Sequence, residues 1–317
     1  MQEFAAIVEQ GQAKVVPSSE VLAYTGPGFA WLHVESMEPR LPTDMRGTTL
    51  PEIVTSALTA TETRPRCDAI DHGAILNLRG TALEIRDDSD WLVSIRLWVQ
   101  RDRIISFSRT TLGAMPKVRT AFLDGKLADP GDLVSMLARE ISLELDPHVA
   151  GLSDQLDDCE TELETSNHYG LRRVVAQIRS TAISLRRFVA PDRDALDALT
   201  SLNFPWLAEE DVLHIREASD RFARMTEELE AVRERAALVH EQLTDLRTEL
   251  VDQRSLYIAI VAFIFLPLTF ITGLLGMNVE GIPFAHHPHA FLGVVLFCIV
   301  VGLVVFGWFG VRHWLRR

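Results

Sequence analysis

The sequence predicts an α+β membrane protein, in which a cytosolic α/β domain continues through a long helical stalk into two C-terminal transmembrane helices. Three observations predict this class. The formal charge is −13, yet the mean hydropathy is +0.11, and all but one of the 44 Asp and Glu residues precede Ser255. Two uncharged runs lie near the C-terminus, and a segment without Gly or Pro leads into the first of them. The acidic and the apolar residues therefore belong to different parts of the chain.

Residues 1–125 form the predicted α/β domain. Short runs of β-branched or aromatic residues, bounded by turn residues, predict strands at 29–34, 74–78, 92–99 and 104–108. Segments 49–60 and 112–123 have the spacing of helices. Strands and helices in this order are typical of a layered α/β domain.

Residues 126–204 form a predicted helical hairpin. Apolar residues recur at helical spacing over 132–165, and a second helix covers 170–189. We expect Pro191 to end this second helix, because proline removes a backbone donor and clashes with the preceding turn.

Residues 205–255 form the predicted stalk helix. Neither Pro nor Gly occurs between Pro205 and Pro267, and apolar residues alternate at spacings of three and four. They are Ile215, Ala218, Phe222, Met225, Leu229, Val232, Ala236, Val239, Leu243, Leu246 and Leu250. This heptad seam predicts one continuous helix that reaches the membrane, and it is equally typical of a coiled-coil stalk without a transport role.

Residues 256–275 and 290–311 carry no charged side chain and are each long enough to cross a bilayer as a helix. The external loop 276–289 between them lacks Lys and Arg, whereas Arg254 precedes the first helix and the basic tail 312–317 follows the second. The positive-inside rule therefore places both termini in the cytoplasm. Two helices are too thin to enclose a hydrated path, so transport would need several copies around an axis.

One face of the first transmembrane helix carries mostly small or weakly polar residues and is acidic at its cytosolic end. We name it the predicted stripe, and it consists of Asp252, Ser255, Ala259, Ala262, Leu266, Thr269 and Gly273. Small residues let helices approach an axis, and carboxylates at an inner mouth concentrate cations, so we expect this face to line a pore. The same residue types also occur at ordinary helix contacts in membranes.

The tripeptide Gly276-Met277-Asn278 follows the first transmembrane helix. Placed after a long cytosolic helix and before a second C-terminal span, it resembles the CorA family of divalent-cation transporters. Five further segments are similar to the ZntB zinc-transport branch of that family, namely 62–66, 78–80, 185–191, 265–273 and 281–283. The resemblance extends over nearly the whole chain.

The resemblance implies a homopentameric funnel in a bacterial inner membrane, with the first transmembrane helix along the axis. It implies that Gly276, Met277 and Asn278 form a selectivity entrance, where Asn278 transiently meets the hydrated cation. The ZntB branch implies zinc as the cargo, coupled to protons, with magnesium, cobalt and cadmium as alternatives. Glu280 is more typical of the magnesium members, whereas Leu275 stands where many of those members have Tyr.

Four side chains of the external loop could attract cations before they enter: Glu280, His286, His287 and His289. Imidazole is a good zinc ligand, and the alternative is a solvated loop that is rich in His. The acidic excess argues against nucleic-acid binding, and no catalytic constellation or resident cofactor is expected. An enzyme is therefore the least favoured class.

The favoured interpretation is a homopentameric transporter of divalent cations, zinc before magnesium or cobalt, embedded in the lipid bilayer. The alternative from a different class is a membrane-anchored coiled-coil scaffold, in which the two spans only tether the acidic domain.

Overall fold

The structure is a computed structural model that describes residues 2–38, 50–61, 64–84, 91–164, 170–277, 281–282 and 288–314. The chain divides into two units, Met1–His240 and Glu241–Arg317, and the helix α6 (Glu209–Leu275) contributes to both.

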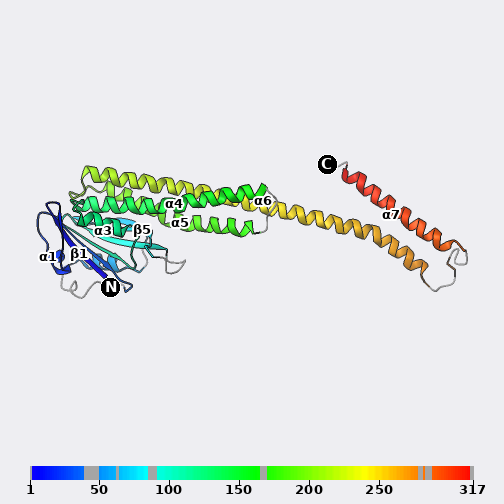
Figure 1. Ribbon diagram of the computed structural model, residues 1–317, viewed down its shortest axis with the longest axis horizontal. Coiled ribbons are helices and arrows are strands. Elements are labelled where there is room, and N and C mark those ends of the chain that lie inside the picture. The colour runs from blue at the N-terminus through cyan, green and yellow to red at the C-terminus, as the bar shows by residue number, and fades with distance from the viewer. Residues whose placement is uncertain are drawn as a thin grey trace. The chain divides into compact units, whose positions relative to one another are not determined.

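A seven-stranded sheet forms the centre of the first unit (Figure 1). Its strands are β1 (Gln2–Glu9), β2 (Gln12–Val15), β3 (Phe29–Glu35), β4 (Arg66–Ile70), β5 (Gly73–Thr81), β6 (Leu92–Val99) and β7 (Arg103–Ser108). They lie in the order β2-β1-β3-β7-β6-β5-β4, and the β3–β7 pair is parallel while the other pairs are antiparallel. The four strands predicted from sequence are confirmed as β3, β5, β6 and β7, and the prediction omitted the other three.

Short helices cover both faces of the sheet. On one face, α1 (Ser18–Ala23) and α2 (Glu52–Thr59) bury a core that includes Ile75, Trp98 and Phe107. On the other face, α3 (Met115–Leu123) places Phe122 against Trp31, with ring centroids 5.4 Å apart. Successive side chains of a strand point to opposite faces, so both layers draw on the same strands.

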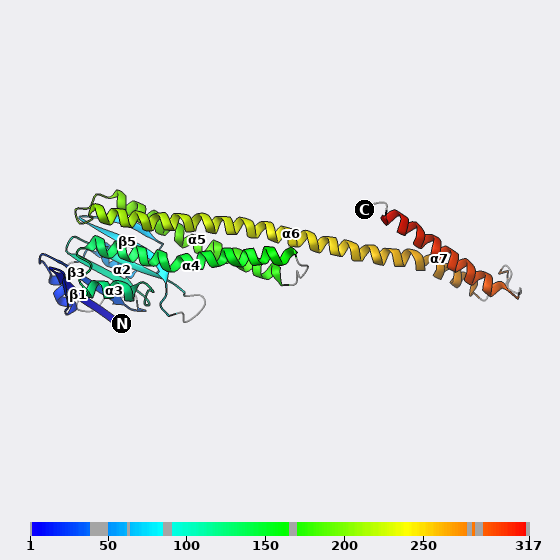
Figure 2. The ribbon, with the colours of Figure 1, turned by 45° about the horizontal axis from the view of Figure 1, so that its top comes forward.

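Three long helices pack together in the first unit, namely α4 (Pro130–Glu164), α5 (Leu171–Ser201) and the first part of α6 (Figures 1 and 2). Arg235 of α6 pairs with Glu160 of α4 at 2.7 Å, and Arg186 of α5 pairs with Glu230 of α6 at 2.7 Å. The heptad seam is at most 6% exposed from Ile215 to Leu243. The heptad pattern is therefore explained by burial within a single chain.

The prediction that Pro191 ends a helix is wrong, because α5 continues through it to Ser201. A proline inside a helix costs about 3 kcal/mol through the lost backbone hydrogen bond and the clash of its ring with the preceding turn, and packing can offset this cost. Beyond the proline, Asp192, Ala195, Leu196 and Leu199 are buried at helical spacing. Asp192 also accepts the backbone N–H of Arg79 in β5 at 3.0 Å, which fixes the continued helix to the sheet.

The second unit contains the end of α6 and the helix α7 (Ala290–Trp314). Both helices are long and apolar enough to cross a membrane. Their large apolar side chains are exposed, as at Leu266 (75%) and Phe291 (82%). Such exposure is unfavourable in water and is expected in lipid. The two predicted membrane spans are thus present as candidate transmembrane helices.

Candidate functional site

The whole predicted stripe lies on α6, and each of its members is exposed in the second unit. It begins at Asp252 and ends at Gly273, close to the C-terminal end of the helix. The only carboxylate of the stripe is Asp252, which precedes the apolar segment.

The less exposed side of the same segment is opposite the stripe. Its half-buried positions are Ile260, Ile264, Pro267, Leu268, Ile271 and Leu275, which recur at spacings of three and four. At 3.6 residues per turn, this set and the stripe occupy opposite sides of the helix. The helix α7 runs back beside the end of α6 and has its own half-buried face, which includes Val294, Cys298 and Val305 (Figures 1 and 2). The stripe is therefore the more exposed side of this segment of α6.

The predicted entrance begins where α6 ends. The N–H of Gly276 donates to the carbonyl oxygen of Thr272 at 2.9 Å, so helical hydrogen bonding extends one residue past Leu275. Met277 follows and is 47% exposed. This segment therefore presents Met277 at the helix end rather than in a packed core.

The remaining predicted loop residues are Asn278, Glu280, His286, His287 and His289. The first four lie outside the described residues. His289 directly precedes α7, and its carbonyl oxygen accepts the N–H of Gly293 at 3.0 Å.

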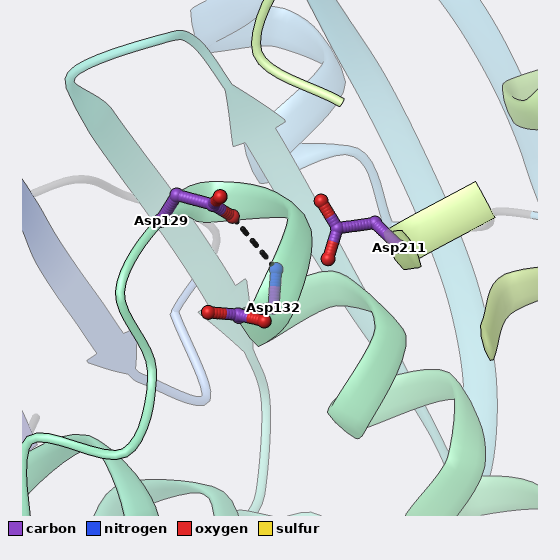
Figure 3. Close-up of side chains that lie close together, drawn as sticks. All are labelled: Asp129, Asp132 and Asp211. Carbon is purple, nitrogen blue, oxygen red and sulfur yellow. Dashed lines mark hydrogen bonds between the residues drawn. The ribbon is translucent and has the colours of Figure 1, made fainter. Parts of the chain in front are cut away.

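The first unit contains an acidic cluster that sequence reasoning did not find, made of Asp129, Asp132 and Asp211 (Figure 3). One carboxylate oxygen from each residue lies within 4.8 Å of the others. Each carboxylate caps backbone donors. The Asp132 N–H donates to Asp129 Oδ1 at 3.0 Å, and the Ala128 N–H donates to Asp132 Oδ2 at 2.7 Å. Asp211 Oδ2 accepts the N–H of Ala208 at 3.0 Å.

The electrostatics of the cluster depend on Asp211, which is 2% exposed. Burial, followed by repulsion from Asp129, raises the pKa of Asp211 to about 6. Burial also raises the pKa of Asp129, and repulsion from the Asp132 carboxylate raises it further. These hydrogen bonds identify the cluster as the caps of α4 and α6. In the sequence, the acidic cluster is indicated only by Asp residues near the starts of two predicted helices, where Asp commonly caps the backbone.

Comparison with known proteins identifies the family. The model of the CorA-like Mg2+ transporter protein matches residues 26–317. The chain belongs to the CorA family. A zinc transport protein ZntB of Pectobacterium carotovorum is 29% identical over 309 residues, which cover 97% of this chain and 92% of that protein. A divalent cation transporter CmaX of Pseudomonas aeruginosa is 31% identical over 290 residues, which cover 89% of this chain and 86% of that protein.

A solved structure of full-length CmaX has the same fold. It matches with a TM-score of 0.81 and 29% identity, and the match covers 98% of this chain and 96% of that one. This CorA-family chain is therefore a divalent-cation transporter built from an α/β domain, a long helix and two candidate C-terminal transmembrane helices.

Proposed function

We propose that this CorA-family chain transports zinc across a bacterial inner membrane, with both termini in the cytoplasm. In this proposal five copies surround an axis, and the predicted stripe lines the path of the cation. The name of the ZntB relative supports zinc as the cargo, and magnesium or cobalt is the alternative within the family. Coupling of zinc movement to protons is part of the proposal.

The observation that carries the proposed path is the exposure of the stripe along one side of α6. In a membrane, an exposed side of a helix contacts lipid or other copies of the chain. Ala259, Ala262 and Gly273 are small, and Thr269 and Ser255 offer hydroxyls. Lipid contact would favour larger apolar residues, whereas a narrow axial path needs small side chains and weak oxygen ligands.

The entrance proposal assigns Gly276, Met277 and Asn278 to the outer end of this path. A ring of neutral amide oxygens from Asn278 can hydrogen-bond the water shell of a cation without binding the ion tightly. Glu280, His286, His287 and His289 would raise the local cation concentration in the external loop.

A pair of matched leucines tests the path. Leu266 belongs to the stripe and is 75% exposed, whereas Leu268 is half-buried on the opposite side. In a Cys298→Ala background, Leu266→Cys and Leu268→Cys are reconstituted separately and treated with a cationic thiol reagent. We expect the reagent to block metal flux only in the Leu266→Cys protein, because water must reach the path. Equal block in both variants, or block only in Leu268→Cys, would contradict the proposed path.

The entrance is tested at Asn278. Asn278→Ala should abolish zinc flux without changing the oligomeric state measured by size-exclusion chromatography with light scattering. Asn278→Gln, which keeps the amide, should retain part of the flux. Wild-type flux from Asn278→Ala would exclude the entrance role.

The scaffold alternative depends on the heptad seam being available to other chains. The seam is buried within the first unit from Ile215 to Val239, which removes that argument. A wild-type protein that assembles and moves no divalent cation would still favour a scaffold.

A further inference from the structure

The first unit contains a cavity of about 680 Å³ whose walls are strongly cationic. Five arginines line it: Arg64, Arg79, Arg96, Arg109 and Arg187. Among the described residues that line this cavity there is no Asp or Glu. Such a concentration of positive charge is unexpected in a chain whose formal charge is −13.

The sheet brings these arginines together. Arg79 of β5 is the cross-strand partner of Ser94 in β6, and Arg96 lies two residues farther along β6, so all three side chains share one face. Arg109 directly follows β7, whose Ser108 pairs with Ile95 of β6. The cavity wall is therefore a row of side chains across three adjacent strands.

The helix α5 closes the cavity from the other side. It contributes Arg187 and Phe188, and the guanidinium of Arg79 lies over the Phe188 ring, 4.0 Å from its centroid. This contact holds Arg79 at the wall by a cation–π interaction. Arg64 reaches the cavity from the segment before β4.

Arg96 is the residue that most needs a ligand. It is 2% exposed, and its Nε and Nη1 have no hydrogen-bond partner within the described part of the chain. Burial, with repulsion from Arg109 and Arg79, lowers the pKa of Arg96 to about 10. Two buried guanidinium nitrogens without acceptors are unfavourable, and an anion in the cavity would supply the acceptors.

The nearest described carboxylate, Asp192, accepts the backbone N–H of Arg79, and burial raises the pKa of Asp192 well above its usual range. By contrast, Arg66, which is not in the cavity wall, pairs with Asp68 at 3.0 Å.

We propose that this cavity binds an anion with at least two linked phosphate groups. Guanidinium forks match phosphate oxygens in geometry, and several of them together favour a highly charged anion over a single phosphate. The cavity volume lies within the range of about 300–1,000 Å³ that is typical of small-molecule sites. Inorganic polyphosphate and nucleotide phosphates share this chemistry. The site lies in the first unit, apart from the proposed path, and does not depend on the zinc proposal.

Binding is tested on the purified full chain in detergent, by isothermal titration calorimetry with a chelator present so that no metal mediates it. The probes are inorganic phosphate, pyrophosphate, triphosphate and ATP. We expect pyrophosphate and triphosphate to bind about 10-fold tighter than phosphate or more, with affinity that falls as salt is added. ATP binding tighter than triphosphate would identify a nucleotide site, and the reverse order an inorganic polyphosphate site.

Variants locate the binding. Arg187→Gln and Arg64→Gln should each lower the affinity for triphosphate or ATP about 10-fold or more, and Arg96→Met should abolish binding. The matched control is Arg66→Gln, which should leave the affinity unchanged because Arg66 lies outside the cavity wall. If Arg96→Met does not fold, the two exposed variants decide. No binding of any probe by the wild type, or equal affinity in Arg187→Gln, Arg64→Gln and wild type, would overturn the proposal.

Discussion

Asp211→Asn should stabilise the folded chain at neutral pH. The carboxylate of Asp211 is buried near Asp129 and Asp132, and the Ala208 N–H and His214 offset only part of their repulsion. In the wild type, the Ala208 N–H donates to Asp211 Oδ2 at 3.0 Å. An asparagine side-chain oxygen can accept the same N–H, so the substitution keeps the helix cap and removes the charge.

The magnitude follows from the pKa of Asp211, which rises from 3.8 to about 6 on folding. This change corresponds to an upper limit of about 3 kcal/mol in the free energy of unfolding at pH 7. Because folding raises the pKa of Asp211, Asp211 is largely protonated in the folded protein and largely ionised in the unfolded chain between about pH 4 and 6. Wild-type stability therefore rises as the pH falls through 6, and the advantage of Asp211→Asn should vanish near pH 4.

Thermal unfolding of the full chain in detergent, followed by tryptophan fluorescence from pH 4 to 8 with EDTA present, measures this difference. Asp220→Asn is the matched control, since Asp220 is exposed on the same helix, and it should change stability by less than about 0.5 kcal/mol. Asp211→Ala should be less stable than Asp211→Asn by about 1 kcal/mol because it loses the cap. A wild type that is more stable than Asp211→Asn at pH 7, or a difference that does not depend on pH, would refute the reasoning.

Four further substitutions test the packing by the same unfolding measurement. Leu229→Ala in the buried seam should cost about 2–5 kcal/mol, whereas Leu250→Ala, at a position 47% exposed, should cost far less; equal losses would contradict seam burial within the chain. Gly28→Ala should destabilise strongly, because a Cβ there would collide with the Val8 carbonyl oxygen, and a neutral result would place β1 differently. Gly151→Ala should stabilise α4 by up to about 1 kcal/mol, because a Cβ there meets no atom within 4 Å; a loss of stability would indicate a contact with another copy.

The long helices and the membrane spans could be predicted because their signals are local, whereas the short helix α1 was not predicted. The heptad seam, the uncharged runs and the β-branched segments each repeat within a short window. The strand β1 contains an apolar run, Phe4–Val8, that the prediction omitted, whereas β2 and β4 lack that signal. In β4, for example, Arg66 and Asp68 alternate with Cys67 and Ala69 at the edge of the sheet, so the strand has little apolar pattern.

The arginine cavity and the acidic cluster could not be predicted, because their residues meet only in the folded chain. Arg79 and Arg187 are more than a hundred positions apart, and the register of the sheet with α5 brings them together. The continuation of α5 past Pro191 also depends on a contact between residues that are distant in the sequence. The hydrogen bond from Arg79 N–H to Asp192 is a long-range contact that overrides a local helix-breaking signal.

Cation flux into proteoliposomes that contain the full-length chain tests zinc transport directly. Zinc and magnesium are measured separately, each with and without a pH gradient, and Asn278→Ala serves as the inactive control. We expect zinc uptake that increases with an inward proton gradient and is lost in Asn278→Ala. Magnesium flux that exceeds zinc flux and is indifferent to pH would contradict proton-coupled zinc transport.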